Sequence, residues 1–406
     1  MSRPPLNPAD RALSGISAEE FAARRERVAQ HVRDERLTGY VLFDQDYIHY
    51  LTGFGFLSNE RPIAVVANLS GDLAAFVPGF EVERVRAETQ FERIESYPEY
   101  PGVEHPMLVL QRVLVELGLT GPIAADSDGY PGILGYQGPA LSAVMGQPVR
   151  ALAPVIERMM VRKSEAEIAL IRESAKWCNL GHRLLQRYSR PGATEAQASL
   201  RAGHEATLAM LDTLGPSCGG QKGSSDGVSA GYRGQIGHRS AWAHAVAHNI
   251  ELRAGDVLVT ETSAPVWGYN AELERAMIIG EPTDEVRRLF EHTAAAQRAA
   301  FAALRPGATC ADVDGAVMRY LEQHDLLSYW RQHTGHAIGL RSHEAPFLDL
   351  GDHTPIEPGM VFTIEPGLYA DGIGGFRHSD TVAVTPDGID ILTFYPRDIE
   401  SLTIPV

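Results

Sequence analysis

The chain has 406 residues, 44% of them hydrophobic, which is enough to fill the cores of two or three domains. Its 36 basic and 52 acidic residues give a formal net charge of −16, which argues against nucleic acid and anionic membrane surfaces as partners. Three cysteines are too few for a disulfide framework, and there is no apolar run of the roughly 18 residues that crossing a membrane needs. The first residues, M-S-R-P-P-L-N-P, lack the apolar core of a secretion signal, so we expect a cytoplasmic protein.

The N-terminal part of the chain shows alternating helix and strand signals. A capping box formed by Ser17 and Glu20 predicts a helix that runs to about Leu37. The apolar run 39–44 then predicts a strand, and the alternation continues to about residue 155. We therefore predict a smaller α/β domain over residues 1–160.

A second capping box, Ser164 with Glu167, begins a long stretch with apolar residues at helical spacing. After it the chain repeats itself. The pentapeptide R-P-G-A-T occurs at Arg190 and again at Arg305. We predict one α+β domain over residues 161–406, built from two similar halves.

The repeat also aligns acidic residues. L-R-A-G-D-V-L-V-T-E ends at Glu261, and I-E-P-G-M-V-F-T-I-E ends at Glu365, 104 positions later. Further along, G-Y-N-A-E ends at Glu272 and parallels G-F-R-H-S, which ends at Ser379. Two halves related in this way predict a pseudo-twofold domain whose paired strands converge on one cleft.

Ionisable side chains gather at the ends of these apolar strands. Carboxylates there, at Glu261 and Glu365, are costly unless they are paired, protonated or bound to metal. Glu272 belongs to the same strand–turn–strand as Glu261, and His336 and His343 lie in G-H-A-I-G-L-R-S-H-E-A-P. The combination predicts a chemically active cleft.

These segments carry a resemblance that covers essentially the whole chain. Three segments, G-H-A-I-G-L-R-S-H-E-A-P, E-P-G-M-V-F-T-I-E-P-G-L-Y and Y-I-H-Y-L-T-G-F, resemble the creatinase/aminopeptidase P/prolidase/methionine aminopeptidase family. The resemblance implies a pita-bread catalytic domain, a creatinase-type N-terminal domain and a homodimer. In such dimers one N-terminal domain reaches the other subunit's cleft, which suggests Tyr100 and His105 as contributors. His244 falls where the family has its substrate-side histidine.

The resemblance also implies a metal site, but the residues at several of its ligand positions differ in this chain. The family's peptidases hold two divalent metals with Asp, Asp, His, Glu and Glu. The matching positions here are Glu261, Glu272, His336, Glu365 and Ser379. Two dications about 4 Å apart repel by roughly 16 kcal/mol at an effective dielectric near 20, and three carboxylates offset this less well than four. We therefore expect no binuclear centre and no cofactor. A single Mn, Zn or Fe ion on the first four positions is the alternative.

Without metal, carboxylates this close should share a proton, which raises one apparent pKa toward neutrality. Such a proton can be given to a leaving nitrogen. The sequence thus favours a metal-independent hydrolase of a C–N bond in a small charged or zwitterionic compound, similar to creatinase or ectoine hydrolase. The alternatives are a metal-dependent Xaa-Pro dipeptidase or aminopeptidase, a lyase of a sulfonium zwitterion, and a catalytically dead small-molecule-binding relative.

Roles follow from this hypothesis. His244 would activate water or shuttle a proton, and Glu261 and Glu365 would hold the protonated or cationic nitrogen of the substrate. One of these two glutamates would donate a proton to the leaving nitrogen or act as a nucleophile. His336 and His343 would hold the carbonyl oxygen or a substrate carboxylate. Arg377 is expected either to pair with an acid in the cleft or to form a solvated or structural salt bridge. The candidates for supporting or binding the substrate are Glu272, His343, Arg377, Tyr369, Trp267 and His105.

Overall fold

The structure is a computed structural model that describes residues 15–215, 218 and 227–406. It divides into two compact units: one ends at Met159 and the other begins at Met160, inside helix α6 (Ala153–Val161). Among the described residues, no helix has both the length and the apolar character that crossing a bilayer requires. Residues 1–14, which include the stretch read for a secretion signal, lie outside the described residues.

The N-terminal unit contains a mixed sheet with the strand order β4-β3-β2-β1-β5-β6. Its strands are β1 (Gly39–Leu42), β2 (Ala64–Asn68), β3 (Leu73–Pro78), β4 (Arg93–Tyr97), β5 (Ala124–Ala125) and β6 (Arg150–Ala151). Its helices are α1 (Ala18–Asp34), α2 (Gln45–Thr52), α3 (Val82–Glu88), α4 (Pro106–Glu116) and α5 (Leu141–Met145), with a 3₁₀ turn at Gly79–Glu81.

The first predicted helix is confirmed, with a difference at its end. The Ser17 hydroxyl accepts a hydrogen bond from the Glu20 N–H at 3.1 Å, as its capping role requires. The helix ends at Asp34, three residues before Leu37, because Arg36 adopts the left-handed conformation with φ of 56°.

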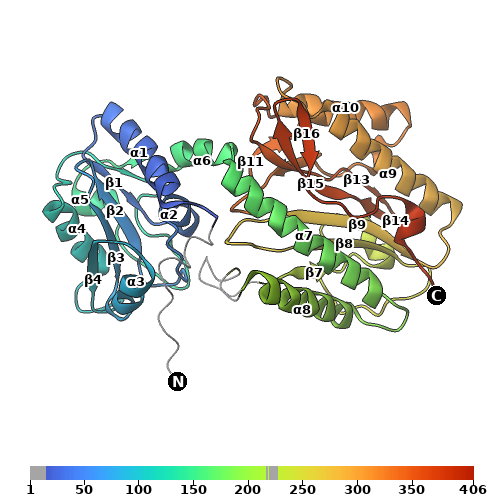
Figure 1. Ribbon diagram of the computed structural model, residues 1–406, viewed down its shortest axis with the longest axis horizontal. Coiled ribbons are helices and arrows are strands. Elements are labelled where there is room, and N and C mark those ends of the chain that lie inside the picture. The colour runs from blue at the N-terminus through green and yellow to red at the C-terminus, as the bar shows by residue number, and fades with distance from the viewer. Residues whose placement is uncertain (1–14, 216–217, 219–226) are drawn as a thin grey trace. The chain divides into compact units, whose positions relative to one another are not determined.

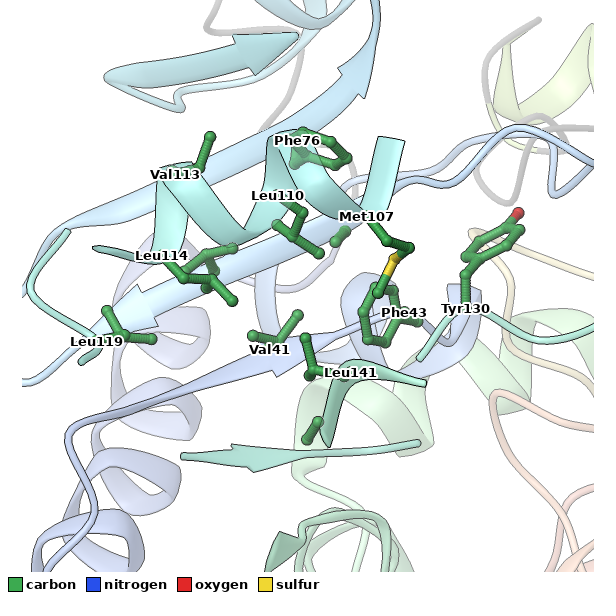
Figure 2. Close-up of a cluster of buried hydrophobic side chains, with 14 of the residues drawn as sticks. Val41, Phe43, Phe76, Met107, Leu110, Val113, Leu114, Leu119, Tyr130 and Leu141 are labelled. Carbon is green, nitrogen blue, oxygen red and sulfur yellow. The ribbon is translucent and has the colours of Figure 1, made fainter. Parts of the chain in front are cut away.

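Apolar side chains from the sheet and from α4 form the core of this unit (Figure 2). Val41 and Phe43 project from the β1 region, and Leu110 and Leu114 reach them from α4. Each is at most 1% exposed. The alternation of helix and strand signals therefore predicted a real packed layer.

The C-terminal unit contains a larger sheet with the strand order β11-β10-β12-β15-β9-β8-β7, and β16 and β17 add to β15 and β9. A separate hairpin joins β13 to β14. The strands are β7 (Ser229–Gly231), β8 (Val257–Ser263), β9 (Glu272–Ile279), β10 (Gly335–Ala337), β11 (Glu344–Leu348), β12 (Val361–Ile364), β13 (Gly367–Ala370), β14 (Gly374–Arg377), β15 (Ser379–Thr385), β16 (Gly388–Ile391) and β17 (Thr403–Ile404).

Helices cover this sheet in two pairs (Figure 1). They are α7 (Glu165–Tyr188) with α8 (Glu195–Leu214), and α9 (Asp284–Ala303) with α10 (Cys310–Gln323); α11 (Ile399–Leu402) and 3₁₀ turns at Gly237–Ala241 and Leu327–Tyr329 complete the unit. Helix α7 packs on β8 and β9, whereas α9 packs on β12, β13 and β14. The mixed helix–sheet architecture predicted from the sequence is confirmed.

The internal repeat appears in the backbone. Gly255 and Gly359 have φ of 90° and 92°, a conformation that favours glycine, and each stands two residues before its strand, β8 or β12. In both R-P-G-A-T segments the threonine, Thr194 or Thr309, caps the second helix of a pair through a complete capping box. The two halves meet at the central pair of strands, β9 and β15.

Candidate active site

A row of side chains crosses the middle of the C-terminal sheet. Glu261 on β8 is the register partner of Glu274 on β9, and Glu274 is in turn the partner of Ser379 on β15. Directly opposite residues in antiparallel strands point to the same face, with Cβ atoms about 4.5–5.5 Å apart. Glu274 therefore lies between the two positions that the sequence analysis identified.

Sequence reasoning missed Glu274. A signal was present, because E-L-E at 272–274 in an apolar strand puts two glutamates on one face of the sheet. The internal repeat pairs Glu272 with Ser379 and ends there, so it does not single out Glu274.

Glu272 is the buried carboxylate that Ser379 contacts. The serine hydroxyl donates a hydrogen bond to Glu272 Oε1 at 2.7 Å. Burial, followed by repulsion from Glu365, raises the pKa of Glu272 to about 7. This agrees with the expectation that one carboxylate of the cluster moves toward neutrality in the absence of a cation.

Glu365, which directly follows β12, faces His336 on β10. Glu365 Oε1 lies 3.1 Å from His336 Nε2. Burial acts to raise the pKa of Glu365, but the contact with His336 outweighs it and holds that pKa at about 2. Burial likewise opposes protonation of His336, yet the contact with Glu365 and the charge of Glu272 raise its pKa to about 9.

The other ring nitrogen of His336 fixes its tautomer. Nδ1 lies 3.0 Å from the Ala337 carbonyl oxygen, which can only accept, so Nδ1 carries a proton. The buried Nε2 atom has no well-directed hydrogen bond. Its lone pair is thus available to a proton or a cation on the side of the carboxylates.

His343 stacks on His336, with ring centroids 3.7 Å apart and planes at 18°. Burial, aided by the neighbouring His336, lowers the pKa of His343 to about 4. A neutral imidazole placed there can hydrogen bond to a substrate but does not add positive charge to the site.

Arg377 is fully buried and belongs to the cluster itself. Its guanidinium forms a two-pronged ion pair with Glu274, and its Nε lies 4.0 Å from Glu365 Oε2. Its Nη1 donates to the Tyr369 hydroxyl at 3.3 Å, and Tyr369 donates to Gln332 at 2.6 Å. The structure therefore places Arg377 and Tyr369 within this network, and contact of either with substrate stays a prediction.

Glu261 occupies the more open side of the row. Its Oε2 lies 2.9 Å from Nε of Arg233, whose side chain is 46% exposed. Arg233 adopts a left-handed backbone with φ of 49°. Sequence reasoning did not identify this arginine, because it follows no motif and reaches Glu261 only through the pairing of β7 with β8.

The remaining candidates lie on loops. His244 is exposed, next to Ala243, whose carbonyl oxygen lies 3.5 Å from Arg377 Nη1. Trp267, at the tip of the turn between β8 and β9, has φ of 46°. The roles of both in substrate handling stay predictions.

His105 and Tyr100 belong to the N-terminal unit. His105 caps α4, because its Nδ1 accepts from the Met107 N–H at 3.2 Å, and its ring packs edge-on against Tyr100. These contacts give His105 a structural role in its own unit. Its proposed reach into a partner's cleft stays a prediction.

The donor atoms fit a divalent cation. One oxygen or nitrogen from each of Glu272, His336 and His343 lie within 4.8 Å of one another, and so do oxygens of Glu272, Glu274 and Glu365. Carboxylate oxygens and an imidazole nitrogen with a fixed tautomer suit Mn, Fe or Zn. The expectation that no cofactor is needed is therefore not supported.

Two models of known families match the chain: metallopeptidase family M24 over residues 169–386, and the creatinase/prolidase N-terminal domain over residues 24–128. The first covers 218 of the 406 residues, more than half of the chain.

Similar proteins and structures extend over both units. A probable dipeptidase PepE of Mycobacterium tuberculosis H37Rv is 29% identical over 401 residues, 96% of this chain and 98% of its own. An Xaa-Pro dipeptidase of Pyrococcus horikoshii is 30% identical over 245 residues, 60% of this chain and 66% of its own. The crystal structure of the dipeptidase PepE from Mycobacterium ulcerans has a TM-score of 0.76 at 26% identity, covering 97% of this chain and 99% of that chain.

Proposed function

Because the chain belongs to metallopeptidase family M24, with the pita-bread fold of the creatinase/aminopeptidase P family, we propose that it is a metal-dependent dipeptidase. This reverses the order of the sequence-based hypotheses, which put a metal-independent hydrolase first. Similar proteins that carry the name dipeptidase support the change. A small-molecule substrate, the cytoplasmic location and the homodimer stay predictions.

One observation carries the proposal. His336 directs its buried Nε2 toward Glu365 and Glu272 while its Nδ1–H is held by a backbone carbonyl, so a cation can take the place of the proton on Nε2. Metal-binding histidines characteristically have their second nitrogen fixed in this way. Glu272, His336 and Glu365 would hold the cation. When bound, a divalent ion polarises the scissile carbonyl group and lowers the pKa of water toward neutrality.

The chain's own residues would position the dipeptide around this centre. Neutral His343 can hydrogen bond to the substrate, and Arg233, half-exposed beside Glu261, offers a guanidinium to a terminal carboxylate. His244, exposed beside the carbonyl group that faces Arg377, can carry a proton to the leaving nitrogen.

A second candidate function is metal-independent hydrolysis of a C–N bond in a small zwitterion. It is favoured by Ser379, a neutral residue that hydrogen bonds to Glu272, and by the buried guanidinium of Arg377 beside Glu365. Both features reduce the negative charge available to cations. Under this hypothesis the proton shared by Glu365 and His336 would replace the metal.

The test compares four substrates on the same preparation: Ala-Pro, Ala-Leu, creatine and ectoine. The protein is assayed after chelation and after Mn²⁺, Zn²⁺ or Fe²⁺ is restored. We expect dipeptide hydrolysis to fall at least 100-fold on chelation and to return with metal. Hydrolysis of creatine or ectoine that is unaffected by chelation would support the second candidate instead. No turnover at all would leave the binding-protein alternative.

A further inference from the structure

We infer that Glu274 is a cation ligand, which supplies from β9 the carboxylate that Ser379 does not provide on β15. The inference rests on the proposed function. It concerns a residue outside the five positions carried over from the family. It also changes the charge count. The five positions include three glutamates, and Glu274 adds a fourth to the cleft.

Register and burial place Glu274 correctly for this role. It is directly opposite Ser379, so its carboxylate starts from the neighbouring position on the same face of the sheet. It is 2% exposed, and one of its oxygens lies within 4.8 Å of oxygens of Glu272 and Glu365. The buried Nε2 of His336, which has no well-directed hydrogen bond, lies 3.1 Å from Glu365 Oε1 in this group.

The pairing with Arg377 does not prevent ligation. A carboxylate offers about four lone-pair sites, and the guanidinium uses two of those on Glu274. Arg377 would therefore orient Glu274, as hydrogen-bonded partners of metal ligands do. Because Arg377 also contacts Tyr369, the carboxylate is held by a chain of buried groups.

Formal charges set the number of cations. As ligands of a cation, Glu272, Glu274 and Glu365 would be ionised and carry −3, and His336 would be neutral. Arg377 carries +1, which leaves −2 in the buried cluster. Glu261 is neutralised separately by Arg233. A charge of −2 matches one divalent cation. The site therefore holds one ion rather than two, and it holds that ion because Glu274 is present.

The experiment measures Mn²⁺ binding to chelator-treated full-length protein by calorimetry, with elemental analysis for stoichiometry. The unchanged protein should bind one Mn²⁺. Glu274→Gln, which keeps the shape and removes the charge, should weaken binding about 100-fold or more. The exchange variant Glu274→Ser/Ser379→Glu moves the carboxylate to the other strand, and its affinity should return to within about tenfold.

Glu344→Gln is the matched control, because it also removes a buried carboxylate from a cation, Lys163, 2.7 Å away. It should bind Mn²⁺ as the unchanged protein does. Unfolding monitored by tryptophan fluorescence in chelator shows whether each variant is folded before metal is added.

The outcomes distinguish a failure of the metal-dependent dipeptidase proposal from a failure of the ligand role of Glu274. If the unchanged protein binds no Mn²⁺, the proposed function fails. If it binds Mn²⁺ and folded Glu274→Gln binds within twofold of it, the role of Glu274 is overturned while the dipeptidase proposal stands. Two ions per chain would overturn the charge count. Recovery in the exchange variant, with no loss in Glu344→Gln, supports the inference.

Discussion

Removing the buried guanidinium of Arg377 is the perturbation whose size can be worked most directly from the structure. Its side chain is 2% exposed, it is paired with Glu274, and it lies 4.0 Å from Glu365. At about 4 Å and an effective dielectric near 20, each pair of unit charges interacts by about 4 kcal/mol, so Arg377→Gln loses roughly 8 kcal/mol of gross attraction.

Relaxation and protonation of the remaining carboxylates will recover part of this. We expect Arg377→Gln to lower the free energy of unfolding in chelator by about 3–5 kcal/mol, the usual cost of breaking one side of a buried pair. The double variant Arg377→Gln/Glu274→Gln should be more stable than Arg377→Gln, because no charge is left unpaired between these two positions.

Urea unfolding followed by tryptophan fluorescence is a suitable assay. The sequence has four tryptophans, Trp177, Trp242, Trp267 and Trp330, and all lie after Met160, so the signal reports the C-terminal unit. A loss below about 1 kcal/mol in Arg377→Gln, or strictly additive losses in the double variant, would refute the claim that these two charges stabilise each other.

Three further predictions concern residues of the C-terminal unit that support the site or the sheet around it. Thr309→Ala removes a capping box and should cost about 1 kcal/mol in urea unfolding, whereas Thr309→Ser, which keeps the capping hydroxyl, should cost little. Gly335→Ala would place a Cβ 2.0 Å from the Thr363 carbonyl oxygen, and should therefore displace β10 and weaken Mn²⁺ binding by His336 at least tenfold in calorimetry. Unchanged Mn²⁺ affinity in a folded variant would contradict this. His378 is buried, and burial lowers its pKa to about 3, so the unfolded chain alone binds this proton between pH 6.5 and 3. Stability should fall by about 1.6 kcal/mol from pH 6.5 to pH 5, and a loss of the same size in His378→Leu would show that His378 is not its source.

Much of the fold could be predicted from local sequence patterns and from the internal repeat. The two glycines at positive φ, the two threonine caps and the paired strands ending near Glu261 and Glu365 all follow from short segments that match each other. These features depend on neighbours in the chain, so the sequence displays them directly. The end of the first helix was predicted less well, because Arg36 adopts a conformation that no motif signals.

The site was predicted incompletely for a different reason. Its composition depends on which residues of β9 and β15 stand opposite each other, and those residues are more than 100 positions apart. A serine at position 379 suggested a missing acid, and only the register shows that Glu274 faces it. The partner of Glu274, Arg377, was among the candidates for pairing with an acid in the cleft, but the sequence did not indicate which acid.

The most direct test of this account is anomalous diffraction from a crystal of the Mn²⁺-loaded protein. We predict one peak per chain, coordinated by carboxylate oxygens of Glu272, Glu274 and Glu365 and by Nε2 of His336. A peak without Glu274 among its ligands, a pair of peaks, or no peak in this cleft would contradict the account.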